Sequence, residues 1–346
     1  MRYFLGISAI VISLFFISCE TVVNYELPIN ATKIVVEGSI ENGHPPLVIL
    51  SKSFSFFGND FNFNDLGELL IKNAVINVSD GNRTVTLMEY NKQALVDLSE
   101  GDFNLIYPTL EQIIAPSLEQ FGDIEITQDT IRKYLLFLPN FTFYTVAPSD
   151  IDFIGEVNRA YGLAINLIDD ATFGTRALSA VTTIPGLVNM DSLWVEDHPN
   201  SEIDTLFQLR TRFRDPDTLG NFYRYFTRVN GGAWLTASAS VFDDGFINGE
   251  SIPFSVTKGQ TERAKLEDPD FDVDGYWAPG DTAEVKICNI TEDHYQFWRT
   301  VENEKSNNGS PFGSFTILAS NIQGEDAVGI WGGYASTILT LVITEP

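Results

Sequence analysis

The sequence is poor in the side chains that most often build reactive or metal-binding sites. Its 346 residues include two cysteines, three histidines and three methionines. Because Cys19 lies in the N-terminal segment considered below, Cys288 is left without a disulfide partner, and a zinc site built from paired cysteines is excluded. His44, His198 and His294 lie far apart and follow no metal-ligand spacing. We therefore expect neither a disulfide framework nor a zinc centre.

Positive charge is also scarce. The chain has 21 lysines and arginines against 47 aspartates and glutamates, which gives a formal net charge of −26. Nucleic acid is excluded as a partner because its phosphates require basic patches, and electrostatic docking on anionic lipid is disfavoured for the same reason. The sequence has no Gly-x-Ser-x-Gly elbow, phosphate-binding loop or metalloprotease motif. We therefore predict a non-catalytic protein that requires no cofactor.

The one long apolar run lies at the N-terminus. It extends from Tyr3 to Ile17 after a single basic residue, Arg2. A bilayer span needs about 20 apolar residues, so this shorter run is typical of a signal peptide. The alternative for the cysteine that follows the run is an accidental residue after an ordinary signal peptide.

The end of this run, Phe16-Ile17-Ser18-Cys19, resembles a bacterial lipobox. Cys19 would then become the first residue of the mature chain and carry acyl chains on its thiol and its amino group. Two or more chains anchor a protein stably to a membrane. We therefore expect residues 1–18 to be a signal peptide and residues 19–32 to be a lipid-anchored tether.

The remainder of the sequence predicts a mostly β fold. Short apolar runs rich in β-branched residues, separated by Gly, Asn, Asp and Pro, indicate antiparallel strands and tight turns. Residues 33–186 are predicted to form an immunoglobulin-like β-sandwich, with a helical insertion at about 107–140 where apolar residues recur at helical spacing. Residues 187–346 are predicted to form a second β-rich, sandwich-like domain with one helix from Thr291 to about Lys305.

A phenylalanine-rich segment at residues 54–65 is the first candidate binding site. It alternates Phe with Asn and Asp, a composition that suits an exposed contact surface. Buried aromatic anchors dominate the energies of protein interfaces, so Phe57, Phe61 and Phe63 are predicted to contact a partner. The alternative is a long loop that folds back over its own sandwich.

An aspartate-rich segment is the second candidate site. Asp270, Asp272, Asp274, the backbone carbonyl of Tyr276 and Asp281 reproduce the ligand spacing of a calcium loop. An aspartate stands where the usual bidentate glutamate would be, and a Pro-Gly pair precedes it, so an isolated acidic turn is the alternative. Ca²⁺ is thus the one cofactor that the sequence suggests.

A set of short phrases follows a fixed order along most of the chain. These phrases are Ile34-Val35-Val36-Glu37-Gly38, Arg212-Phe213-Arg214-Asp215-Pro216, Gly220-Asn221-Phe222-Tyr223-Arg224, Phe242-Asp243-Asp244-Gly245, Asn248-Gly249-Glu250, Pro279-Gly280-Asp281-Thr282 and Gly329-Ile330-Trp331-Gly332-Gly333-Tyr334-Ala335. Together they resemble an uncharacterised lipoprotein family of Bacteroidota, whose genes often lie beside those of TonB-dependent outer-membrane receptors.

The resemblance implies an outer-membrane lipoprotein that is an accessory or binding subunit of a TonB-dependent transport system, with the receptor as its partner. It implies no catalytic residues, because the shared phrases look like turns, strand ends and core aromatics. The alternative is a structural or adhesive surface lipoprotein without a transport partner. Either location, cell surface or periplasmic face, agrees with the sequence.

Overall fold

The computed structural model describes residues 31–53, 66–118, 125–135, 137, 140–261, 273–306 and 317–344. Three sheets dominate these ranges, so the predicted mostly β fold is confirmed. None of the helices in the described ranges combines the length and the apolar character that crossing a bilayer requires.

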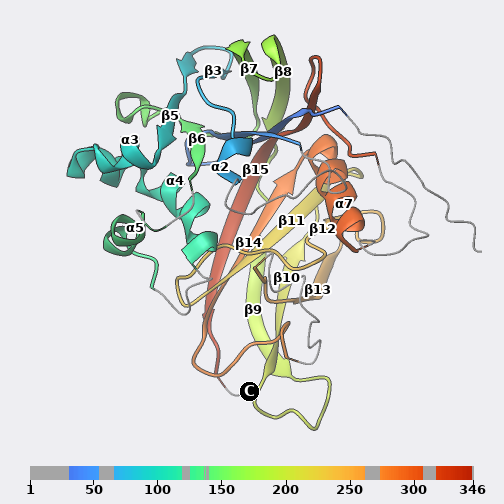
Figure 1. The fold of residues 1–346 in the computed structure, drawn as a ribbon. Coiled ribbons are helices and arrows are strands. Elements are labelled where there is room, and N and C mark those ends of the chain that lie inside the picture. The colour runs from blue at the N-terminus through green and yellow to red at the C-terminus, as the bar shows by residue number, and fades with distance from the viewer. Residues whose placement is uncertain are drawn as a thin grey trace, which may run out of the picture.

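The largest sheet has eight strands in the order β12-β11-β14-β15-β1-β2-β6-β5. Their bounds, in sheet order, are Val241–Asp243, Phe222–Val229, Thr282–Ile290, Ala327–Val342, Ile34–Glu41, Leu47–Lys52, Thr142–Thr145 and Met88–Asn91. Only β1 and β15 of this sheet pair in parallel. These two strands come from opposite ends of the chain (Figure 1), so strands from both sides of the boundary predicted at residue 186 belong to one continuous sheet.

Two smaller sheets cover one face of the eight-stranded sheet. The first has the order β4-β3-β7-β8, with bounds Thr84–Thr86, Val75–Ser79, Arg159–Asp170 and Gly174–Ile184. The second has the order β13-β10-β9, with bounds Ser251–Val256, Phe207–Arg214 and Met190–Asp197. Each packs its apolar face on the large sheet. The sandwich-like architecture is therefore confirmed in outline, and the immunoglobulin-like detail stays a prediction.

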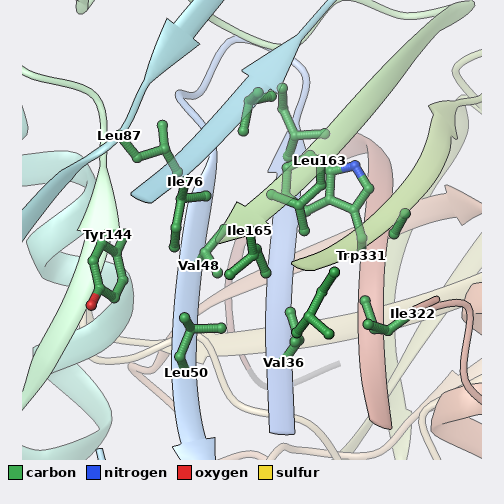
Figure 2. Packing of buried hydrophobic residues seen from close by; sticks show 14 of the residues in the cluster. Val36, Val48, Leu50, Ile76, Leu87, Tyr144, Leu163, Ile165, Ile322 and Trp331 are labelled. Atoms are coloured by element: carbon green, nitrogen blue, oxygen red, sulfur yellow. The ribbon is translucent and has the colours of Figure 1, made fainter. Parts of the chain in front are cut away.

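Trp331 of β15 is the centre of the first sandwich (Figure 2). Its indole is fully buried near Val36 and Leu163, and its Nε1 donates a hydrogen bond of 2.9 Å to the Tyr161 carbonyl in the opposite sheet. On the neighbouring strand β1, a Cβ at Gly38 would lie 2.8 Å from the indole Cε3. The absence of a side chain at Gly38 therefore makes room for the tryptophan.

Helices α3 (Lys92–Val96), α4 (Glu100–Leu118) and α5 (Gln128–Tyr134) cover the other face of the large sheet near β5 and β6. The helical insertion thus begins at Lys92, well before the predicted residue 107. Two caps explain the difference: Asn91 Oδ1 accepts from the Ala94 amide at 3.0 Å, and Ser99 Oγ accepts from the Asp102 amide at 3.1 Å. Such caps satisfy free amides at a helix start.

The remaining helices are α2 (Leu66–Leu69), the short 3-10 turn η4 (Pro148–Asp150) and α7 (Glu292–Ser306). The bounds of α7 confirm the helix that was predicted after Thr291. It packs on β11, β12 and β15, on the same face of the large sheet as α4 but toward the other edge of the sheet. Tyr295 of α7 is buried there, and its ring stacks on Phe222 of β11 with centroids 4.9 Å apart.

Candidate functional site

Most residues of the predicted sites lie outside the described part of the chain. These are the lipid-attachment residue Cys19, the aromatic residues Phe57, Phe61 and Phe63, and the aspartates Asp270 and Asp272. Their predicted roles therefore stay predictions.

The described part of the predicted calcium loop makes contacts within the protein. Asp281 accepts hydrogen bonds of 3.1 Å from the Ala278 amide and from Asn230 Nδ2, which fixes the turn before β14. The ring of Tyr276 lies 3.9 Å from the ring of His198, centroid to centroid. Within the described ranges, no group of three or more His, Cys, Asp or Glu side chains could hold a metal ion.

Two loops at one end of the second sandwich form a surface that the sequence analysis did not identify. Residues 215–221 join β10 to β11, and residues 243–250 extend from the last residue of β12 to the start of β13; we call them together the double-loop tip. Phe246 is fully exposed, at 102%, and Leu219 is 75% exposed. Large apolar side chains displayed in this way often mark an interaction site.

Each loop is held by a buried carboxylate of the other. Asp244 accepts from the amides of Gly220 and Asn221 at 2.8 and 2.9 Å, and from Asn221 Nδ2 at 3.1 Å. Asp215 accepts from the Gly249 amide at 3.0 Å and from the Tyr223 hydroxyl. Hydrogen bonds to an ionised carboxylate are stronger than neutral ones, and both aspartates are almost completely buried. The backbone of the double-loop tip is therefore fixed before any partner arrives.

The tip is also connected to helix α7 and is acidic at its rim. Asp243 Oδ2 accepts a hydrogen bond of 2.9 Å from the Tyr295 hydroxyl, while Asp217 and Glu250 are exposed in the same two loops as the apolar residues. A fixed conformation lowers the ordering entropy that binding costs. Burial of Leu219 and Phe246 would contribute about 1.5–3 kcal/mol each. The arrangement is therefore suited to binding a partner.

The sequence did contain a signal for this tip. Asp215, Gly220, Asp244 and Gly249 all belong to the phrases that carry the family resemblance, which by themselves look like turns, strand ends and core aromatics. Nothing in a linear sequence shows that an aspartate of one turn accepts hydrogen bonds from the other turn.

Buried ion pairs lie between the helices and the large sheet. Lys286 Nζ of β14 is 3.3 Å from Glu41 Oε2 of β1, and both side chains are nearly buried. The Ser336 hydroxyl of the intervening strand donates to Glu41 Oε1 at 2.6 Å. Burial alone would raise the pKa of the Glu41 carboxyl, but Lys286 and Ser336 outweigh it, so that this pKa lies below its ordinary value. Glu41 is thus ionised at neutral pH.

A second ion-pair cluster connects the helical insertion to the sheet. Arg228 of β11 forms a bidentate pair with Glu284, at 2.5 and 2.7 Å, and its Nη1 is 3.2 Å from Glu111 Oε1 of α4. The Trp234 ring covers the guanidinium at 4.6 Å. Burial raises the pKa of the Glu111 carboxyl despite the neighbouring Arg228. These contacts hold α4 on the sheet.

His294 of α7 and Cys288 of β14 are both buried, and both are uncharged at neutral pH. Burial, with a smaller contribution from Arg224, lowers the pKa of His294 to about 3. Burial also raises the pKa of the Cys288 thiol. Arg224 itself stacks on Trp298 at 3.6 Å and donates to the Tyr334 hydroxyl at 2.7 Å. At neutral pH the site therefore holds a neutral imidazole and a protonated thiol, and its polar contacts fix α7 to the sheet.

Fold and surface together define a mostly β protein in which two sandwiches share one sheet and a rigid double-loop tip projects from one end. The chain belongs to the family described as Domain of unknown function (DUF4249), whose model matches residues 20–339. Comparison with curated proteins finds no match. The expected membership of an uncharacterised family is thus confirmed.

Proposed function

We propose that the protein is a lipid-anchored, non-catalytic binding subunit that associates with a TonB-dependent receptor at the outer membrane. The observation that carries this proposal is the double-loop tip, where Leu219 and Phe246 are exposed on loops fixed by Asp215 and Asp244. The predicted anchor at Cys19 and the predicted tether, residues 19–32, supply a way to hold such a tip near a membrane partner.

Tethering strengthens the effect of a weak contact. Two molecules confined to one membrane have a high effective concentration, so a modest affinity gives substantial occupancy. The acidic rim formed by Asp217, Asp243 and Glu250 favours a partner surface with basic groups around an apolar recess. Bacteroidota origin and the receptor as partner rest on the family resemblance, and the segment with Phe57, Phe61 and Phe63 is proposed as a further contact.

Removal of the two apolar side chains at the tip should abolish association. For the double variant Leu219→Ser and Phe246→Ser, we expect recovery of the receptor from detergent-solubilised outer membranes to fall at least about tenfold, since each 1.4 kcal/mol of lost burial weakens binding tenfold. The variant should unfold at the same temperature as the wild type, because exposed side chains contribute little to stability.

The matched control is Phe137→Ser, which removes an equally large side chain that is 73% exposed on the helical insertion. This control should recover the receptor as well as the wild type does. Equal recovery with the tip variant would show that the tip is not the contact. Recovery of the wild-type protein without any receptor would contradict the proposed function itself.

A further inference from the structure

The four-stranded sheet turns a face without charge toward solvent. Side chains alternate between the two faces of a strand, and the inward set forms the core of the first sandwich. The outward set is Thr84 and Thr86 of β4; Val75, Asn77 and Ser79 of β3; Ala160, Gly162, Ala164, Asn166 and Ile168 of β7; and Thr175, Ala177, Ser179, Val181 and Thr183 of β8. None of these residues, all in the described part of the chain, is charged. We call this surface the uncharged face.

The uncharged face is open to solvent. Gly162 lies between Ser79 and Val181 on the neighbouring strands, and a Cβ built at Gly162 meets no atom within 4 Å. Val181 is 67% exposed and Ile168 is 65% exposed. Two hydroxyl groups bond within the face: Thr86 Oγ1 donates to Asn77 Oδ1 at 2.7 Å, and Thr84 Oγ1 donates to Ser79 Oγ at 3.1 Å. Covering this part of the face with an apolar surface would therefore leave these two hydroxyl groups with their partners.

Charges lie around the edges of this face: Asp169 is exposed at the end of β7, and two arginines at the edges are paired with aspartates. Arg159 lies 2.9 Å from Asp80 at one end, and Arg176 lies 3.1 Å from Asp326 beside β8. Specific protein interfaces have a centre depleted of charge and a polar rim. In a chain of net charge −26, an uncharged face of this size is where another surface can approach with the least electrostatic cost.

We propose that the uncharged face joins two copies of this chain back to back across a two-fold axis. A two-fold interface uses the same patch on both partners, and a face of small, uncharged residues can meet its own copy without repulsion between like charges. Sheets pack face to face about 10 Å apart, and the opposite face of this same sheet is packed on the eight-stranded sheet. The like charges of two copies repel one another, so the contact forms where neither copy presents a charge.

The area of the face sets the strength of the pairing. Four strands about 4.8 Å apart and up to five outward residues along β7 give roughly 500 Å² per copy. The two copies together bury roughly 1,000 Å², at the lower limit for a specific interface. The pairing is therefore reversible. Because the charges repel, raising the salt from about 0.1 M to about 1 M, which shortens the Debye length from about 10 to about 3 Å, strengthens it.

Sedimentation equilibrium of the purified full chain in nonionic detergent tests this pairing. We expect the mass to move from monomer to dimer as protein or salt concentration rises. Val181→Glu places two like charges in the contact and should raise the dimer dissociation constant more than about 100-fold. Gly162→Val fills open space with apolar surface and should lower it.

The matched control is Val342→Glu, which places the same charge on an exposed strand residue, 55% exposed, outside the face. It should leave the dimer unchanged. A protein that is monomeric at every concentration and salt, or a Val181→Glu dimer as tight as the wild type, would overturn the proposal. Cross-links from position 181 to a different protein instead of a second copy would also overturn it. None of these results depends on receptor binding by the double-loop tip.

Discussion

A chain in which Gly329 is replaced by alanine is expected not to fold. Gly329 of β15 pairs with Val36 in the parallel ladder that joins the two ends of the chain. Its φ is +138°, a conformation that residues with a side chain rarely adopt, and an added Cβ would lie well inside contact distance of the Val36 carbonyl oxygen. The obstructing atom belongs to the backbone of β1, so it can move only if the parallel pairing breaks.

The expected loss from Gly329→Ala exceeds about 4 kcal/mol, which is exceptional for one substitution and a large part of the usual 5–15 kcal/mol of total stability. Urea unfolding, or the yield of soluble protein if none folds, measures it. Gly162→Ala is the matched control: it adds the same methyl group to a strand glycine with open space around it, and it should be neutral or slightly stabilising. Equal midpoints for the two variants would show that β1 and β15 do not pair as described.

Removal of the Lys286 ammonium is expected to cost about 3–5 kcal/mol, because a buried carboxylate that loses its partner is strongly unfavourable. Lys286→Met keeps most of the side-chain volume beside Phe226 and Trp234, both about 5 Å from the ammonium. It leaves Glu41 charged and nearly buried. The double variant Lys286→Met and Glu41→Gln should regain much of the loss, because it has no buried charge.

The pH dependence of this variant gives an independent check. In the wild type the pKa of Glu41 is lowered from 4.5, so its stabilising contribution is present above pH 4.5 and is lost as the pH falls through the folded-state pKa. In Lys286→Met, burial dominates and raises this pKa, so the deficit should shrink as the pH falls toward 4.5. A deficit that grows on acidification would show that Glu41 does not pair with Lys286.

Local sequence patterns were sufficient to predict elements that depend on neighbouring residues. Short apolar runs rich in β-branched residues predicted the strands, and the residues from Thr291 onward predicted α7 almost to the residue. The spacing of apolar residues predicts an insertion from about residue 107, whereas the helix-start signals lie earlier in the sequence. Ser99 and Asp102 follow the spacing of a capping box, and Ser99 Oγ does accept from the Asp102 amide.

Contacts between distant segments could not be predicted in the same way. Gly38 and Trp331 both lie in phrases that carry the family resemblance. Only the parallel pairing of β1 with β15, however, shows why a glycine faces the indole. The double-loop tip also depends on contacts between distant residues, because Asp215 and Asp244 each accept a hydrogen bond from an amide of the other loop. Such contacts depend on tertiary structure, and the spacing of apolar residues along the sequence does not predict them.

Photo-cross-linking in intact cells is the most direct test of the central proposal, that the double-loop tip contacts an outer-membrane receptor. A photo-reactive phenylalanine analogue replaces Phe246 in one strain and Phe137 in a control strain; both residues are exposed phenylalanines, on the tip and on the helical insertion. Our account predicts a cross-link from position 246 to a TonB-dependent receptor and none from position 137. A receptor cross-link from position 137 alone, or from neither position, would contradict it.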